Sequence, residues 1–166
     1  MAPKIKVGDI FEIPLSDGRS AYGQYIFRDS KMGPIIQIFN RISESHIEIE
    51  DLRYSKLLFP PVITGLYGAI RTGLWTIIGY LPVKEFIYPN FISTTFDLRS
   101  GHIGTWYLWD GQRSRQIGSH LPEIYKQLEF LVVWAPQDVV IRIETGQLQE
   151  PYRTLINENR LIAPLV

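Results

Sequence analysis

The chain has 166 residues, 45% of them hydrophobic, with seventeen basic and seventeen acidic side chains that cancel and with no cysteine. The lack of cysteine excludes disulfides, thiolate nucleophiles and zinc sites built on sulfur, and a net charge of zero provides no overall attraction to nucleic acid or an anionic membrane. The start lacks the apolar run of a secretory signal, and prolines and glycines interrupt the apolar stretch Leu57–Leu81. We therefore expect a cytoplasmic protein without a membrane span.

Three β-strands are predicted first. Val7–Leu15 has apolar residues at alternate positions, and Pro14, which cannot donate a hydrogen bond to a central ladder, predicts an edge strand. Asp17-Gly18 is typical of a hairpin turn. The strands Ser20–Phe27 and Pro34–Asn40 follow, so the opening is expected to form an antiparallel meander.

The middle of the chain is less regular. Ser45–Leu52 alternates acids with isoleucines and predicts a half-buried strand whose acids face solvent. Leu57–Thr72 contains apolar residues at helical spacing and predicts a short helix, although its glycines weaken one. Trp75–Leu81 has the composition of a strand and Pro82–Asn90 that of a loop.

The second half opens with a hairpin, because Asp110-Gly111 separates the β-prone runs Thr105–Trp109 and Gln112–Ile117. Pro122 and the helical spacing of its apolar residues predict a helix over Leu121–Phe130. The remaining predicted elements are a buried strand at Phe130–Trp134, a strand or a helix at Pro136–Thr145, and a short helix at Tyr152–Asn157.

These elements predict an α+β fold, mainly a curved antiparallel sheet or a small barrel with one to three short helices. No linker, low-complexity tract or fixed-period repeat interrupts the sequence. We therefore expect residues 1–166 to form a single domain.

The sequence contains no recognisable catalytic or metal-binding motif. His46, His102 and His120 are the only imidazoles, and none lies in a catalytic or zinc-binding motif. The glycines do not form a phosphate-binding loop between a strand and a helix. We assign no catalytic residue, no metal ligand and no cofactor.

A run of acids is the most distinctive charge feature of the sequence. Glu44, Glu48, Glu50 and Asp51 are accompanied by His46 and suit docking of a cationic partner. The same charges also suit an edge strand that is protected against self-pairing. We take these five residues as the candidate partner-binding site.

Several segments of the chain carry a resemblance to a known family, namely Lys6–Gln24, Gly33–Ile36, Gly73–Gly79, Tyr88–Phe91 and Trp134–Thr145. They resemble the immunity protein 26 family of bacterial polymorphic toxin systems. The resemblance implies a cytoplasmic α+β protein that neutralises a cognate toxin by stoichiometric binding, without a cofactor. If that toxin is a nuclease with a basic cleft, the acidic run supplies complementary charge.

Two other function classes fit parts of the sequence. The opening Gly-Asp-Ile-Phe with its hairpin is also similar to small barrels of endoribonuclease toxins, for which Arg19, Asp97 and His102 are the candidate catalytic groups. Trp106 and Trp109 are suited to stacking on a carbohydrate. They lie on opposite faces of a strand, however, so at least one of them is expected in the core.

Overall fold

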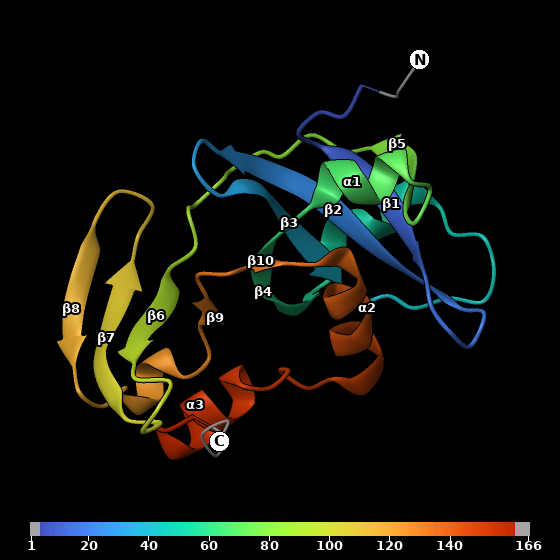
Figure 1. Ribbon diagram of the computed structural model, residues 1–166. Helices are drawn as coiled ribbons and strands as arrows, with labels where there is room; N and C mark the ends of the chain where they lie inside the picture. The colour runs from blue at the N-terminus through green and yellow to red at the C-terminus, as the bar shows by residue number, and fades with distance from the viewer. Residues whose placement is uncertain (1–3, 162–166) are drawn as a thin grey trace. The chain divides into compact units, whose positions relative to one another are not determined.

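The computed structural model describes residues 4–161, and its contacts divide the chain into two compact units. The first unit extends to Ile87 and includes Val133–Thr145, while the second consists of Tyr88–Val132 and the chain from Gly146 onward. In Figure 1 the colours follow the chain as it leaves and re-enters the first unit. Each unit is therefore assembled from segments that are separate in sequence.

The first unit is built on a six-stranded open sheet in the order β10-β4-β3-β2-β1-β5. Its strands pair antiparallel except for β10, which pairs parallel to β4. The strands are β1 (Asp9–Pro14), β2 (Ser20–Asp29), β3 (Gly33–Phe39), β4 (Leu57–Thr64), β5 (Thr76–Tyr80) and β10 (Val133–Trp134).

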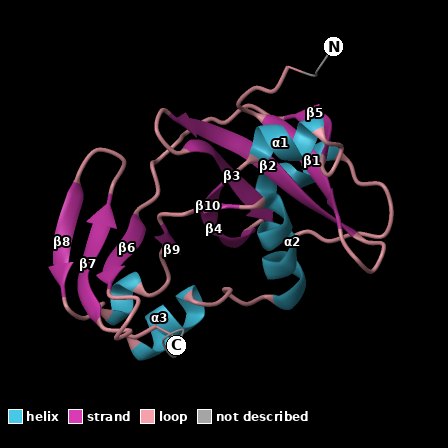
Figure 2. Cartoon of the chain, in the orientation of Figure 1, coloured by secondary structure: helices cyan, strands magenta, loops and turns pink. Residues whose placement is uncertain are grey.

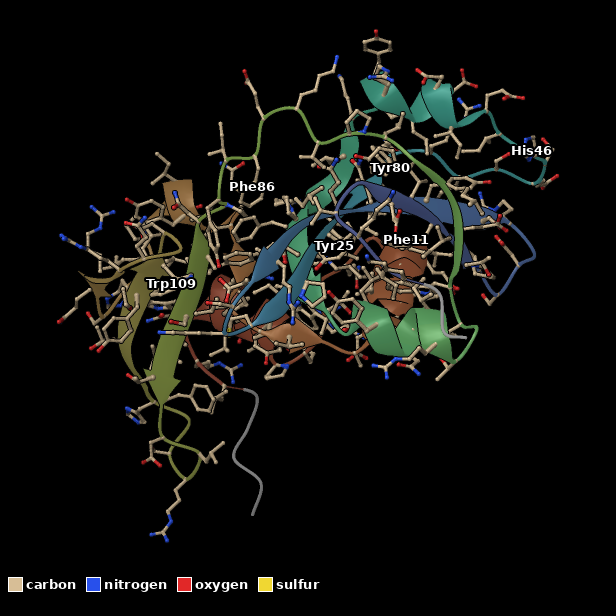
Figure 3. All side chains as sticks on the ribbon, turned by 90° about the horizontal axis from the view of Figure 1, so that it is seen from above. Phe11, Tyr25, His46, Tyr80, Phe86 and Trp109 are labelled. Carbon is tan, nitrogen blue, oxygen red and sulfur yellow. The ribbon has the colours of Figure 1, made fainter. Side chains whose placement is uncertain are left out.

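Different structures cover the two faces of this sheet, as Figure 3 shows. The helices α1 (Leu66–Arg71) and α2 (Pro136–Thr145) lie on one face, where Phe11 stacks on Trp75 with ring centroids 5.3 Å apart. The 3₁₀ helix η1 (Ile49–Tyr54) and the loop after β5 lie over the other. Neither of these is a long regular element, which leaves part of the second face open.

The second unit contains a four-stranded sheet in the order β8-β7-β6-β9. Its core gathers seven buried side chains, among them Trp106 and Phe130. Figure 2 distinguishes its strands from its helices. The elements are β6 (Phe91–Phe96), β7 (Ile103–Trp109), β8 (Ser114–Gly118), η2 (Glu123–Tyr125), β9 (Glu129–Phe130) and α3 (Tyr152–Glu158).

The predicted fold class is confirmed: the structure is α+β, largely antiparallel, with open sheets instead of a closed barrel. The N-terminal meander, the hairpin at Asp110-Gly111 and the short helix near Tyr152 are present. The ambiguous segment Pro136–Thr145 is helix α2. No helix among residues 4–161 is long and apolar enough to cross a membrane.

The prediction that the first strand lies at an edge is wrong, because β1 pairs with both β2 and β5. Its pairing with β5 extends only from Asp9 to Glu12. Pro14 therefore lies beyond the last residue of β1 that pairs with β5. Its missing N–H removes no hydrogen bond from that pairing. A proline at the last position of a strand does not identify an edge.

The predicted strand over Ser45–Leu52 is also wrong. The segment is a loop followed by η1, since β3 already pairs with β2 on one side and β4 on the other. The alternation nevertheless indicated the inward side chains correctly, because Ile47 and Leu52 are 5% and 0% exposed. Burial was therefore predicted correctly although the backbone conformation was not.

Tertiary pairing also overrides the two predicted helices. The first half of Leu57–Thr72 is strand β4, and only the second half is helical. Pro60 and Pro61 lie at a shift in the pairing register of β4 with β3, where no regular ladder of hydrogen bonds is required. Leu121–Phe130 forms the single turn η2 and then β9, which pairs with β6. The predicted strand Phe130–Trp134 is split between β9 and β10, which belong to different sheets.

Gly23 in β2 allows the Phe11 ring to lie flat against the sheet. A Cβ at Gly23 would lie 2.5 Å from Cε2 of Phe11, and this ring is fixed by its stacking on Trp75. We expect Gly23→Ala to lower the free energy of unfolding by about 1–3 kcal/mol, measured by chemical denaturation. The matched control is Gly68→Ala in α1, where nothing lies within 4 Å and a gain of about 0.5–1 kcal/mol is expected. Equal effects of the two changes would contradict the overpacking argument.

We propose that the two units fold as one domain. The first unit is completed by β10 and α2, which follow the strands of the second unit in sequence. A fragment ending at Ile87 lacks Trp134, Val139 and Ile143, which are all buried. We expect this fragment to show no cooperative transition in urea, whereas the full chain unfolds in one. Two separate transitions of the full chain would contradict the proposal.

Candidate functional site

Residues 43–54 form a continuous surface segment that crosses the open face of the first sheet. The connection from β3 to β4 is closed at its base by a hydrogen bond, in which the Asn40 N–H donates to the Lys56 carbonyl at 2.7 Å. It is fastened to β2 by an isolated bridge between Ser20 and Ser43, with N···O distances of 2.9 and 3.0 Å. This segment 43–54 is therefore held at both ends and is anchored in the middle by buried Ile47.

The segment 43–54 borders two hollows on this face. One, the acidic hollow, has a volume of about 320 Å³ and lies between residues 43–49 and the strands, with Glu12 and Tyr22 in its lining. The other, called the cleft below, has a volume of about 500 Å³ and lies between Leu52–Tyr54 and the loop Leu81–Ile87. A single segment thus contributes to both concave surfaces.

The cleft has a polar floor, and its rim carries exposed apolar side chains beside the exposed charges of Lys84 and Glu85. The Gln37 amide donates to Gln24 at 2.9 Å, and the Gln24 amide donates to the Leu81 carbonyl at 2.7 Å. At the rim Tyr54 is 88% and Ile87 is 85% exposed. Both side chains are therefore available for contact with another protein.

The five candidate binding residues are divided by the structure. Glu44, His46 and Glu48 line the acidic hollow, whereas Glu50 and Asp51 lie on η1 and line neither hollow. Figure 3 shows His46 in the loop that precedes η1. Its Nε2 lies 4.0 Å from a Glu48 carboxylate oxygen, and both side chains are exposed.

Glu50 is already paired within the segment. Its two carboxylate oxygens accept hydrogen bonds from the Arg53 guanidinium at 2.9 and 3.0 Å. This bidentate contact holds the pKa of Glu50 below its usual value. Glu50 is therefore charged at neutral pH, but its charge is partly compensated by Arg53.

Four residues of this face were not predicted from the sequence. Glu12 and Tyr22 occupy paired positions on neighbouring strands and line the acidic hollow, while Tyr54 and Ile87 line the cleft. Glu12 was recognisable as a charge within an apolar strand. Nothing in the sequence distinguishes Tyr54 and Ile87 from core residues, because their exposure follows from the loop geometry.

The three residues considered for an RNase do not all lie in one unit. Arg19 belongs to the first unit and pairs with Asp17 at 2.7 Å, whereas Asp97 and His102 belong to the second. The Asp97 carboxylate accepts bonds from the Arg99 N–H and the Ser100 hydroxyl, which lower its pKa. Across residues 4–161 there is also no cluster of three or more His, Cys, Asp or Glu side chains that suits a metal.

The tryptophans do not form a shared stacking platform. Trp106 is completely buried, and its indole N–H donates to Asn159 at 2.8 Å. Trp109 lies on the opposite face of β7, where its indole N–H donates to the Tyr88 hydroxyl at 3.3 Å. As expected, one of the pair is a core residue.

The comparison with protein families confirms the sequence resemblance for the first part of the chain, while the segment Trp134–Thr145 lies outside the match. The family model of immunity protein 26 matches residues 6–101, which is more than half of the chain. The protein therefore belongs to the immunity protein 26 family. No curated protein and no solved structure matches the chain. Segment 43–54 and the linings of both hollows lie inside the matched region.

Proposed function

We propose that this protein is an immunity protein that binds a cognate toxin of a bacterial polymorphic toxin system and neutralises it by forming a stoichiometric complex. The observation that carries the proposal is membership of the immunity protein 26 family. The proposal places the protein in the cytoplasm and requires no cofactor. A chain without cysteine is suited to that reducing compartment.

The shape and composition of the open face support segment 43–54 as part of the toxin-binding surface. Protein interfaces combine a few large apolar or aromatic anchors with a polar rim that is accessible to water. Tyr54 and Ile87 supply exposed anchors at the cleft. The acidic residues of the segment supply the polar rim beside them.

The charge of this segment favours a basic partner. The segment has a net negative charge at neutral pH. It carries four acidic side chains and one basic side chain, Arg53; the acids are Glu44, Glu48, Glu50 and Asp51. A nuclease toxin must bind the phosphates of its substrate and therefore presents a basic cleft. Blocking such a cleft with an acidic surface is the form of inhibition that we propose.

The direct test is to produce the chain together with the product of the neighbouring open reading frame. We expect the two proteins to co-purify in a fixed ratio, and cells that produce the neighbouring protein to grow only when this chain is present. Toxicity that this chain does not relieve, with no complex on size-exclusion chromatography, would contradict the proposal.

Reversing the charge of the segment should slow association with the toxin. We expect lysine at Glu44, Glu48, Glu50 and Asp51 to lower the association rate at low salt by about tenfold or more and to flatten its salt dependence, because attraction becomes repulsion. Stopped-flow fluorescence measures both quantities. A variant with Gln or Asn at the same positions should lie between the two, and equal rates for all three proteins would show that the segment does not guide binding.

Removing the apolar anchors should weaken the complex without unfolding the protein. We expect Tyr54→Ala and Ile87→Ala each to raise the Kd for the toxin by about tenfold, since both side chains are exposed and line the cleft. Stability should change by less than about 0.5 kcal/mol. The control is Ile124→Ala, an isoleucine that is 70% exposed in the second unit. A loss of affinity only in this control would place the interface elsewhere.

A further inference from the structure

The acidic hollow has a lining of one predominant charge. Glu12 from β1 and Glu44 and Glu48 from the segment all contribute to it, and no lysine or arginine is among the described residues that line it. One Glu12 oxygen accepts a hydrogen bond from the Ser20 hydroxyl at 2.9 Å. His46 also lines the hollow, and its Nε2 lies 4.0 Å from one Glu48 oxygen. The remaining carboxylate oxygens leave acceptor positions for a cation.

Tyr22 supplies a second and independent feature of the hollow. The residue is only 3% exposed, and among residues 4–161 its hydroxyl has no hydrogen-bond partner. The ring packs in the core cluster beside Ile10 and Ile47, while the residue also lines the hollow. The hydroxyl is therefore left to bond with water or with a ligand that enters the hollow.

The surroundings of Tyr22 are adapted to a positive charge. Glu12 is directly opposite Tyr22 in the antiparallel register, so the two side chains lie next to each other on one face. Burial, and then the Glu12 carboxylate, raise the pKa of Tyr22, with a smaller opposing effect from Arg41. The phenol is therefore neutral at physiological pH, and its oxygen can accept a hydrogen bond.

The apolar part of the hollow accommodates an aliphatic stem. Ile47, Ile49 and Ile78 contribute to the lining together with the polar groups. An arginine side chain combines methylene groups with a planar head that carries five N–H donors, and its guanidinium is less strongly hydrated than an ammonium. The carboxylates, the phenol oxygen and the isoleucines of the lining together match that combination.

We propose that the acidic hollow is a binding site for one arginine side chain of the partner protein, held by Glu12, Glu48 and the Tyr22 hydroxyl. This inference rests on the proposed function for the identity of the partner. It adds Glu12 and Tyr22 to the binding surface. It also distinguishes these two residues, which contact the inserted side chain, from Glu50 and Asp51, which act on the toxin through their charge alone.

The test uses the full-length chain and N-acetyl-arginine amide as the probe, followed by ¹H–¹⁵N NMR. We expect saturable shifts of amide signals confined to residues 43–49 and to the strand residues beside Glu12 and Tyr22. The corresponding citrulline amide has the same shape without the charge and should cause no such shifts. No saturable shift with the arginine probe, or equal shifts with citrulline, would overturn the inference.

Two variants separate binding from structure. We expect Glu12→Gln to raise the Kd for the probe by about tenfold and Tyr22→Phe by about threefold, in line with the loss of a charged and a neutral acceptor. Glu123→Gln removes the same charge from a residue that does not line the hollow and should leave the Kd unchanged. Since the Tyr22 hydroxyl bonds to nothing in the described chain, Tyr22→Phe should fold normally, as its own spectrum will show.

The same variants can be measured against the toxin. If wild-type protein neutralises the toxin but Tyr22→Phe and Glu12→Gln bind it with unchanged affinity, the arginine site is wrong while the proposed function stands. If the probe binds the hollow but no toxin is neutralised, the proposed function fails and the claim that the arginine comes from a toxin fails with it. The two results are therefore distinguishable.

Discussion

The open face of the first sheet takes its shape from the pairing of β4 with β3. Once β4 occupies that edge, the residues between the two strands have no place in the sheet. These residues must cross the face of the sheet. The hydrogen bond from the Asn40 N–H to the Lys56 carbonyl closes this connection at its base. The segment therefore forms both hollows because strand pairing excludes it from the ladder.

Burial at two points gives this irregular segment a defined position. Ile47 and Leu52 are 5% and 0% exposed, and Ile49 packs close against Gly79 in β5. Transfer of such side chains from water contributes about 1.5–3 kcal/mol each. The acids between them remain in water, where they are accessible to a partner. Fixed apolar anchors thus position charged groups that make few contacts of their own.

The sequence was sufficient to predict patterns but not pairings. The inward side chains of segment 43–54 and the outward acids followed from alternation, and the two Asp-Gly turns identified hairpins correctly. Leu121–Phe130 has helical periodicity, yet Glu129 and Phe130 pair with β6, a partner that lies far back in sequence. Glu12 and Tyr22 were missed for the same reason, because only the register places them beside residues 43–49.

The hydroxyl of Tyr22 and the indole nitrogen of Trp75 are both polar groups without a partner in the described chain, but their situations differ. The Trp75 nitrogen is sealed in the core against Phe11, so its desolvation cost persists in every state of the folded protein. Tyr22 borders a hollow large enough to admit a side chain. Its hydroxyl can accept a hydrogen bond from a partner that supplies an N–H donor. A polar group without a protein partner is therefore informative about function only where a ligand can reach it.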